Sequence, residues 1–146
     1  MNPITFTVTG HPKPQPRPRA FARNMGGGKF AARVYDAGTA EGWKSLIAAA
    51  AKPHLPPEPL RVPVGIRIGF SMPRPKNHFT ASGALRPSAP LSPTNKNDLD
   101  NLTKAVCDTL TQIGMWQDDG QIIEMTLCKG YSINTTGGCK ITIFIP

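Results

Sequence analysis

Apolar and polar residues alternate in four short segments of this chain, which is the pattern of β-strands with one buried face. In the first segment, Ile4, Phe6 and Val8 alternate with threonines. The same period of two recurs with Val64, Ile66, Ile68 and Phe70, then with Ile123, Met125 and Leu127, and last with Cys139, Ile141, Ile143 and Ile145. Asn134, Gly137 and Gly138 predict a turn before the last strand.

Two further segments repeat their apolar residues every three to four positions and therefore predict amphipathic helices. The first has Trp43, Leu46, Ile47 and Ala50 on one face. Asp36 or Thr39 could cap its start, and Pro53 marks its end. The second runs from about 98 to 113 and is expected to bury Leu99, Leu102, Val106, Leu110 and Ile113. Gly114 follows it, where a glycine commonly ends a helix.

These elements follow one another in the order β-α-β-α-β-β. Such an order predicts an α+β fold, in which a small mixed β-sheet of about four strands has both helices packed on it. A chain of 146 residues is long enough for one hydrophobic core but short for two. We therefore expect a single domain spanning residues 1–146.

Two segments between the elements lack this periodicity. Residues 11–33 are basic and rich in proline and glycine, with a proline at every second position from 12 to 18. Because proline has no N–H group and a fixed φ, this segment is expected to be extended and loop-like, and its GGGK stretch to be a flexible turn. Residues 71–97 form a long loop, and loops of that length are typically functional or disordered.

The basic residues are concentrated before residue 98. The net charge is +8, and fourteen of the seventeen Lys and Arg residues lie in residues 1–97. A polyanion is therefore the leading candidate partner. The candidate DNA-binding residues are Lys13, Arg17, Arg19, Arg23, Lys29, Arg74 and Lys76. Phe21, Phe30 and Tyr35 lie among the arginines and could either stack on bases or fill a core.

The remaining composition excludes several classes of protein. Cys107, Cys128 and Cys139 are too scattered for a zinc site, and their odd number argues against a disulfide framework, so we expect small buried side chains in a reducing cytosol. The three histidines lie beside proline-rich segments and are expected at the surface. No apolar run approaches the roughly 20 residues that span a bilayer, and the start has no signal-peptide pattern. We expect a cytoplasmic protein with no membrane association.

Residues 95–119 have the opposite charge from their surroundings, because they hold five of the nine acidic residues and two basic ones. If a helix begins at Asp98, then Asp100, Lys104 and Asp108 lie four residues apart on one side of it. Clustered carboxylates provide the oxygen ligands that Mg²⁺ prefers. Such a metal ion can activate water for phosphodiester hydrolysis, and Lys104 would add a positive charge near the phosphate.

Each of these residues also has a purely structural interpretation. Asp98 could cap the helix, Asp100 and Lys104 could form an ordinary surface pair, and the following DDG tripeptide could be a turn. Taken together, however, the acids favour a metal site, because bringing anions together without a cation costs stability. The pattern alone leaves open whether Asp118 or Asp119 approaches the start of the helix.

The stretch DLDNLTKAVCDTL…WQDDGQI closely resembles the signature of the RusA-like Holliday-junction resolvases, compact endodeoxyribonucleases common in bacteria and their prophages. The family pattern has two aspartates one residue apart, a lysine four residues after the second, and another aspartate fifteen residues beyond the lysine. Those positions fall on Asp98, Asp100, Lys104 and Asp119. The opening GHPKPQPRPR and the helix WKSLIAAAAK also lie where the family has them, so the resemblance spans most of the chain.

The resemblance implies a Mg²⁺-dependent homodimer that cuts four-way DNA junctions by paired, symmetric nicks in DNA recombination and repair. By this resemblance Asp98, Asp100 and Asp119 are metal ligands, Lys104 is catalytic, and Mn²⁺ could substitute for Mg²⁺. The 71–97 loop matches the family less well, so the DNA contacts and any sequence preference stay open. Two other functions are kept: a nuclease of flaps or forks, and a non-catalytic nucleic-acid-binding module whose acids are structural.

Overall fold

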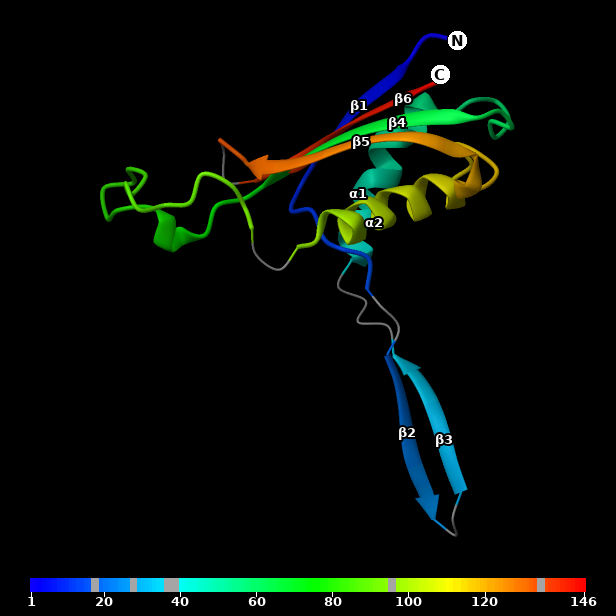
Figure 1. Ribbon diagram of the computed structural model, residues 1–146, viewed down its shortest axis with the longest axis horizontal. Helices are drawn as coiled ribbons and strands as arrows, with labels where there is room; N and C mark the ends of the chain where they lie inside the picture. The colour runs from blue at the N-terminus through cyan, green and yellow to red at the C-terminus, as the bar shows by residue number, and fades with distance from the viewer. Residues whose placement is uncertain (17–18, 27–28, 36–39, 95–96, 134–135) are drawn as a thin grey trace.

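The computed structural model has a four-stranded mixed sheet with two helices on one of its faces (Figure 1). It describes all residues except 17–18, 27–28, 36–39, 95–96 and 134–135, and the description of the residues between 19 and 35 is of the backbone. The strand order is β1 (Ile4–Thr9), β6 (Gly138–Phe144), β4 (Val64–Met72) and β5 (Ile122–Tyr131). Only β4 and β5 run parallel. The expected α+β fold and order of elements are confirmed.

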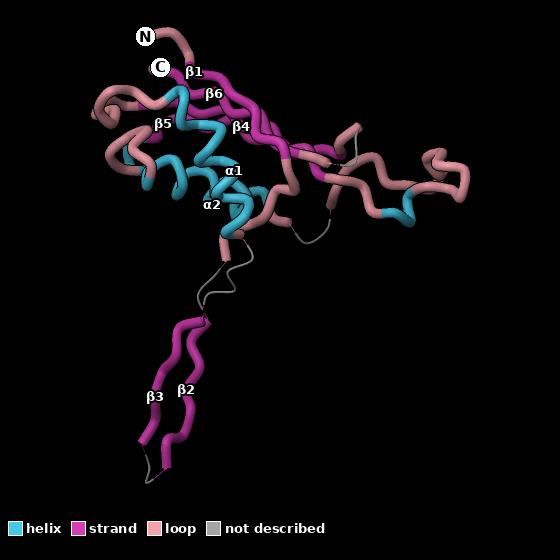
Figure 2. The backbone as a smooth tube through the Cα atoms, turned by 180° about the vertical axis from the view of Figure 1, so that it is seen from behind, coloured by secondary structure: helices cyan, strands magenta, loops and turns pink. Residues whose placement is uncertain are grey.

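Alternating side chains build the core of this sheet. Phe6 and Val8 of β1 are buried, while the threonines between them point to the opposite face. The same alternation buries Val64, Ile66, Ile68, Phe70 and Met72 of β4 and Ile141 and Ile143 of β6. The opposite face has no helix on it (Figure 2). There the Oγ1 atoms of Thr5 and Thr142 lie 3.1 Å apart, and Arg67 lies over the ring of Phe144.

Two apolar positions of the third predicted strand do not enter the core. Ile123 is 65% exposed and Met125 is 45% exposed. Strand β5 is one of the two edge strands, and its pairing shifts so that Val64 lies opposite Ile122 and Gly65 opposite Glu124. Ile123 is thus an extra residue at the shift in pairing. Because β5 has a neighbouring strand on one side only, the side chains of Ile123 and Met125 stay exposed. Similarly, β6 ends at Phe144, so the expected strand residue Ile145 lies beyond it and is exposed.

Helix α1 (Glu41–Ala51) buries Trp43, Ile47 and Ala51 against the sheet. These residues are four apart, which places Leu46 at the margin of the buried stripe, where it is 45% exposed rather than buried as expected. The N-cap residue is Ala40, and the two expected caps lie outside the described residues. A short 3₁₀ turn, η1 (Lys52–His54), follows the helix at Pro53.

Helix α2 (Leu99–Gln112) has the predicted buried stripe. Leu102, Val106 and Leu110 are fully buried, and the two end residues of the stripe pack partly buried against the same core. Gly114 follows with φ of +88°, the left-handed conformation that glycine adopts without strain. None of the helices among the described residues is long and apolar enough to cross a membrane.

Part of the basic segment forms a β-hairpin instead of the expected loop. Strands β2 (Arg19–Gly26) and β3 (Lys29–Tyr35) pair antiparallel and lie well apart from the sheet (Figures 1 and 2). The prolines that argued against a strand end at position 18, and every residue from Arg19 to Tyr35 has the N–H group that pairing requires. Two residues of the expected GGGK turn lie outside the described residues.

The long loop begins at Pro73, because β4 continues to Met72. Its described part folds on itself through a 3₁₀ turn, η2 (Lys76–His78), and a bridge between Phe79 and Leu85. Arg74 Nη1 also donates a hydrogen bond to the carbonyl oxygen of Pro90 at 2.8 Å. Backbone and side-chain hydrogen bonds therefore give this part of the loop a defined shape.

The three cysteines divide into two environments. Cys107 and Cys139 are buried as expected, but Cys128 is exposed. Cys128 belongs to β5 and lies two residues from Thr126, on the side of the edge strand that no helix covers. The expectation that all three thiols are buried is therefore wrong for Cys128.

Candidate active site

Asp98 and Asp100 lie at the start of helix α2 with exposed carboxylates. Asp98 is the N-cap residue and has extended backbone angles, yet its side chain accepts no capping hydrogen bond. Asp100 Oδ1 accepts one hydrogen bond from the backbone N–H of Asn101 at 2.9 Å. Capping, the main structural interpretation of Asp98, therefore does not explain its side chain.

Lys104 lies one turn further along the helix. Its Nζ is 3.3 Å from Asp108 Oδ1, so it pairs with the following aspartate rather than with Asp100. The Lys104 side chain is 61% exposed. An exposed pair of this spacing contributes only about 0.3–0.5 kcal/mol. Lys104 can therefore leave Asp108 for another anion at little cost.

Asp118 and Asp119 are held in different ways. Asp118 caps the 3₁₀ turn η3 (Asp119–Gln121), where its Oδ1 accepts a hydrogen bond from the N–H of Gly120 at 2.6 Å. Asp119 turns instead towards α2, where its Oδ1 accepts hydrogen bonds from Thr111 Oγ1 and from Trp116 Nε1, the latter at 3.2 Å. Trp116 itself is buried as expected. Asp119 is thus the member of the pair that lies against the helix.

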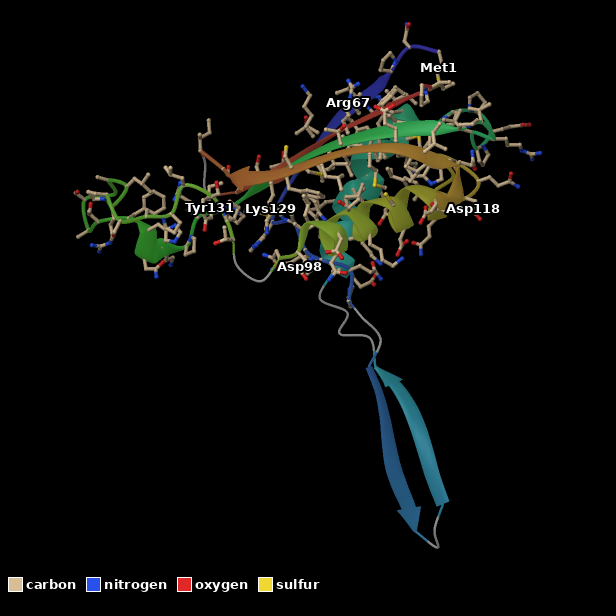
Figure 3. All side chains as sticks on the ribbon, in the orientation of Figure 1. Met1, Arg67, Asp98, Asp118, Lys129 and Tyr131 are labelled. Atoms are coloured by element: carbon tan, nitrogen blue, oxygen red, sulfur yellow. The ribbon has the colours of Figure 1, made fainter. Side chains whose placement is uncertain are left out.

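The structure does not bring these four aspartates together within one chain. Thr111 lies eleven residues beyond Asp100, and a helix rises 1.5 Å per residue, so Asp119 lies roughly 16 Å from Asp100 along the axis. Figure 3 shows Asp98 and Asp118 at opposite ends of α2. Among the described residues, no group of three or more His, Cys, Asp or Glu side chains could hold a metal ion.

The direction of β5 explains this separation. The strand begins at Ile122, beside the C-terminal end of α2, and runs back towards the start of the helix. The sequence left open that a strand packed beside the helix could return Asp118 or Asp119 to the start of α2. Instead, Lys129 arrives there, and its Nζ donates a hydrogen bond to the backbone oxygen of Asn97 at 2.7 Å.

The donors at the start of α2 suit a hard divalent cation. Mg²⁺ is usually bound by one or two carboxylates, with waters and substrate phosphate completing its octahedron. Asp98 and Asp100 are two exposed carboxylates on one helix end, and one of them has no hydrogen-bond partner among the described residues. The residues present therefore fit Mg²⁺ at this end, with Asp119 too distant to join them in the same chain.

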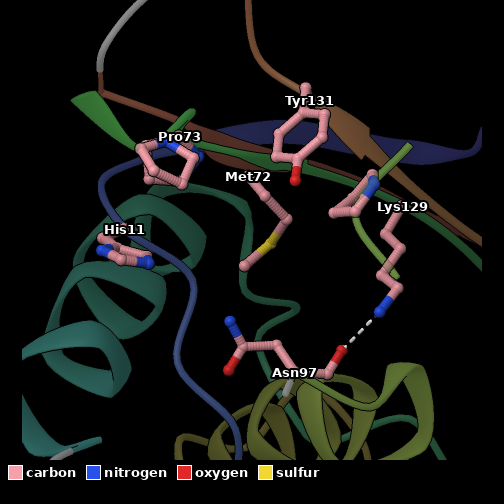
Figure 4. A pocket seen from close by; sticks show the side chains of 8 residues that line it. His11, Met72, Pro73, Asn97, Lys129 and Tyr131 are labelled. Carbon is pink, nitrogen blue, oxygen red and sulfur yellow. Dashed lines mark hydrogen bonds between the residues drawn. The ribbon is translucent and has the colours of Figure 1, made fainter. Parts of the chain in front are cut away.

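A cavity of about 170 Å³ lies beside Asn97, the residue before Asp98 in the sequence (Figure 4). Its lining includes His11, Asn97, Lys129 and Tyr131, which come from three separate parts of the chain. The sequence reasoning did not identify this group. One signal was present: Lys129 and Tyr131 continue the period of two that begins at Met125 and Leu127, which places them on the helix-covered side of β5.

The candidate DNA-binding residues have mixed positions. Lys76 is exposed and Lys13 is partly buried. Arg74 stacks over the ring of Tyr131, with its Cζ 4.2 Å from the ring centroid, so it also has a structural role. Arg17 lies outside the described residues. The structure places the backbone of Arg19, Arg23 and Lys29 in the β2–β3 hairpin.

His11 and His54 are exposed as expected, whereas His78 is half-buried. The His54 ring stacks on Phe6 with centroids 5.5 Å apart, and His78 meets the ring of Tyr131 edge-on at 5.4 Å. Burial, and secondly the charge of Lys13, lower the pKa of His11 from its ordinary value. His11 therefore favours its neutral form.

Comparison with known proteins matches residues 9–144 to the family model described as endodeoxyribonuclease RusA. The chain is 33% identical over 134 residues to the uncharacterized protein YqaN of Bacillus subtilis (strain 168), covering 90% of each chain. It is 27% identical over 143 residues to the crossover junction endodeoxyribonuclease RusA of Escherichia coli (strain K12), covering 98% of this chain and 95% of the relative. The same name, identity and coverage are found for a protein of Enterobacteria phage 82.

Proposed function

The chain belongs to the RusA endodeoxyribonuclease family, and from this we propose that it is a Mg²⁺-dependent endonuclease that resolves Holliday junctions in DNA recombination and repair. The observation that carries the proposal is the pair of exposed carboxylates, Asp98 and Asp100, at the start of α2. The absence of a capping hydrogen bond at Asp98 supports a role for it outside the helix. The enzyme would act in the cytoplasm, on chromosomal, prophage or phage DNA.

We propose that Asp98 and Asp100 hold the metal ion, for which Mn²⁺ could substitute. A bound divalent ion supplies a water of lowered pKa and a positive charge against the charge that develops on the phosphate. Lys104 lies one turn from Asp100 and is weakly paired, so it can turn towards a phosphate bound at the carboxylates. There its ammonium group would stabilise negative charge in the transition state.

Asp119 is proposed as a ligand contributed by a second protomer. The spacing to Lys104 favours Asp119, and its orientation towards α2 supports the choice over Asp118, whose carboxylate caps η3. A twofold axis that sets two α2 helices side by side and antiparallel brings the C-terminal end of one next to the N-terminal end of the other. Such a homodimer has two sites, each with Asp98 and Asp100 from one subunit and Asp119 from the other.

DNA would be held by the basic residues around this site. Lys13 and Lys76 are proposed to contact phosphates, which releases counterions and adds affinity without reading sequence. In the register of the hairpin, Arg19 lies opposite Tyr35 and Phe21 lies opposite Arg33. A two-stranded ribbon of this kind fits the major groove, so we propose that Arg19, Arg23 and Lys29 belong to an arm that grips one junction branch. Arg17 is also proposed to bind DNA.

The test is cleavage of a mobile four-way junction with and without Mg²⁺. The wild-type protein should convert it into symmetric nicked duplexes when the metal is present. Asp100→Asn should bind the junction as tightly as the wild type does. Its cleavage rate should fall by at least roughly 10- to 100-fold, the loss typical when a residue that only hydrogen-bonds to a metal ligand is replaced. Glu58→Gln, an acid-to-amide change in an exposed loop, is the matched control and should cut at the wild-type rate.

Three results would contradict parts of this proposal. Unchanged cleavage by Asp100→Asn would remove it from the site. Faster cutting of flaps or forks than of four-way junctions would identify a nuclease of other branched DNA. Tight junction binding with no cutting in Mg²⁺ or Mn²⁺ would identify a non-catalytic binding module.

A further inference from the structure

The cavity beside Asn97 is formed where three strand ends meet the loop that precedes α2. His11 follows β1, Met72 ends β4, and Lys129 and Tyr131 end β5. Asn97 closes the cavity from the side of α2, and it is the residue immediately before Asp98. A ligand in the cavity therefore contacts the residue that precedes Asp98, whose Cα atom is about 3.8 Å from that of Asp98.

Four of the eight lining residues that the structure describes, a methionine and three prolines, offer apolar surfaces, and the other four carry polar groups. Met72 is buried and contributes its thioether, while Pro73 and Pro75 contribute ring faces. The Tyr131 ring is fixed from outside the cavity, because the guanidinium of Arg74 stacks on it and His78 meets its edge. The hydrogen bond from Arg74 to the Pro90 carbonyl oxygen anchors the arginine in turn. The ring is thus held in place before any ligand enters.

A few polar groups point into the same space (Figure 4). Neither the side-chain amide of Asn97 nor the hydroxyl of Tyr131 has a hydrogen-bond partner among the residues that the structure describes. His11 adds one ring donor and one ring acceptor in its neutral form. Lys129 lies at the opposite side, where its hydrogen bond to the Asn97 carbonyl oxygen ties the end of β5 to the start of α2. These groups can pair with the edge of a ring.

From this geometry we propose that the cavity binds one unstacked nucleobase next to the phosphate that is cut, and that it gives the enzyme a sequence preference. The volume of about 170 Å³ is well below the roughly 300–1,000 Å³ of sites for drug-sized ligands, so it suits a single base rather than a nucleotide. Apolar walls with unpaired amide and hydroxyl groups match the faces and edge of a base. The inference rests on the proposed function, since it needs a DNA strand at Asp98.

A phosphate is a poorer match for the same cavity. Among the lining residues that the structure describes, Lys129 is the one lysine or arginine, and its ammonium group already donates to a carbonyl oxygen. A buried anion facing proline rings and a thioether would remain undercompensated. A neutral, planar base loses less solvation there, and unstacking is least costly where pairing is already disturbed, as it is at a branch point.

The test removes single polar groups from the cavity and maps where a junction that migrates through many sequences is nicked. The wild-type enzyme should concentrate its nicks at a minority of sequences. Asn97→Ala and Tyr131→Phe should each reduce the ratio of preferred to disfavoured nicks by roughly two- to tenfold, the value of one lost neutral hydrogen bond. Asn77→Ala, an exposed asparagine of the 71–97 loop, is the matched control and should keep the wild-type pattern.

A binding measurement in Ca²⁺ separates this inference from the proposed function. A junction with an abasic nucleotide beside the preferred nick should bind the wild-type protein several-fold more weakly than the intact junction does. For the two variants the abasic nucleotide should reduce the affinity less, because the substitution has already removed the contact that the base makes. Equal losses of affinity for the wild type and the variants, or unchanged nick patterns in the variants, would contradict the proposal that the cavity binds a base. If the wild-type protein binds junctions but never cuts them, the proposed function fails, and abasic nucleotides placed in turn at each position of the branch point then decide the pocket. If it binds no junction, both fail.

Discussion

At the scale of single residues, the surroundings give chemically identical aspartates different roles. Asp98 is exposed and makes no capping hydrogen bond, so its oxygens are available to a metal ion. Asp108 is paired with Lys104, and Asp118 caps the turn η3. Asp119 accepts hydrogen bonds from Thr111 and Trp116, which fix its direction. The spacing of these residues in the sequence indicates that they form a group, but only their partners distinguish them.

The cysteines allow a prediction at the same scale. Burial raises the pKa of Cys139 to about 12, and burial, together with the nearby charge of Asp119, raises the pKa of Cys107 to about 12. Both thiols therefore stay protonated and unreactive at pH 8. A colorimetric thiol reagent should label one cysteine of the native protein rapidly, the exposed Cys128, and all three after unfolding. Cys128→Ser should abolish the rapid reaction, and rapid labelling of that variant would contradict the assignment.

The pH dependence of stability follows from the same raised pKa values. In the unfolded chain these two thiols ionise near their ordinary value of 9.0, whereas in the folded protein they hold their protons to about 12. Their contribution to stability is therefore fully present below about pH 9 and is lost as the pH rises towards 12. The free energy of unfolding in urea, measured from pH 8 to pH 11, should fall for the wild type. A Cys107→Ala, Cys139→Ala double variant should show a smaller fall, and an equal fall would contradict this explanation.

At the scale of elements, the sequence predicted best where a segment has one buried face. The strands β1 and β4 and the helix α2 were predicted because packing on the sheet imposes a period on their apolar residues. The β2–β3 hairpin was missed because it lies apart from the core and nothing imposes such a period on it. Likewise the cavity could not be predicted, since its lining comes from strand ends that only the sheet topology brings together.

The close pairing of β1 with β6 depends on a glycine, which gives a test of the sheet. Gly138 has φ of +151°, and a Cβ atom there would overlap the carbonyl oxygen of Val8. Gly138→Ala should lower the free energy of unfolding by roughly 3 kcal/mol, near the upper end of ordinary substitutions, because both the backbone conformation and the strand pairing are disturbed. Urea denaturation measures this loss.

Gly130→Ala in β5 provides the matched control. A Cβ atom at Gly130 meets nothing within 4 Å, and its φ is not positive. The substitution should change stability by no more than about 0.5 kcal/mol. Comparable losses for the two variants would show that the close approach of β1 to β6 is not what requires glycine at 138.

At the scale of the whole molecule, the fold holds the three candidate metal ligands at two opposite ends of α2. The sheet and helices form a core that fixes both ends of α2, and the strand β5 connects those ends by running alongside the helix. This connection puts Asp119 at one end and Asp98 with Asp100 at the other. A rigid helix cannot bend to join them, so a site that uses all three carboxylates requires two chains.

A subunit-complementation experiment tests this arrangement. Asp100→Asn and Asp119→Asn chains, co-expressed with different affinity tags, would be purified as the mixed dimer, whose mass in sedimentation should be twice the 15.7 kDa of one chain. If each site takes ligands from both subunits, one site of the mixed dimer has both substitutions and the other has none. The mixed dimer should therefore nick junctions in single strands at up to about half the wild-type rate, while both parent dimers stay inactive. A mixed dimer as inactive as its parents would place all three ligands in one chain, and an active Asp119→Asn parent would remove Asp119 from the site.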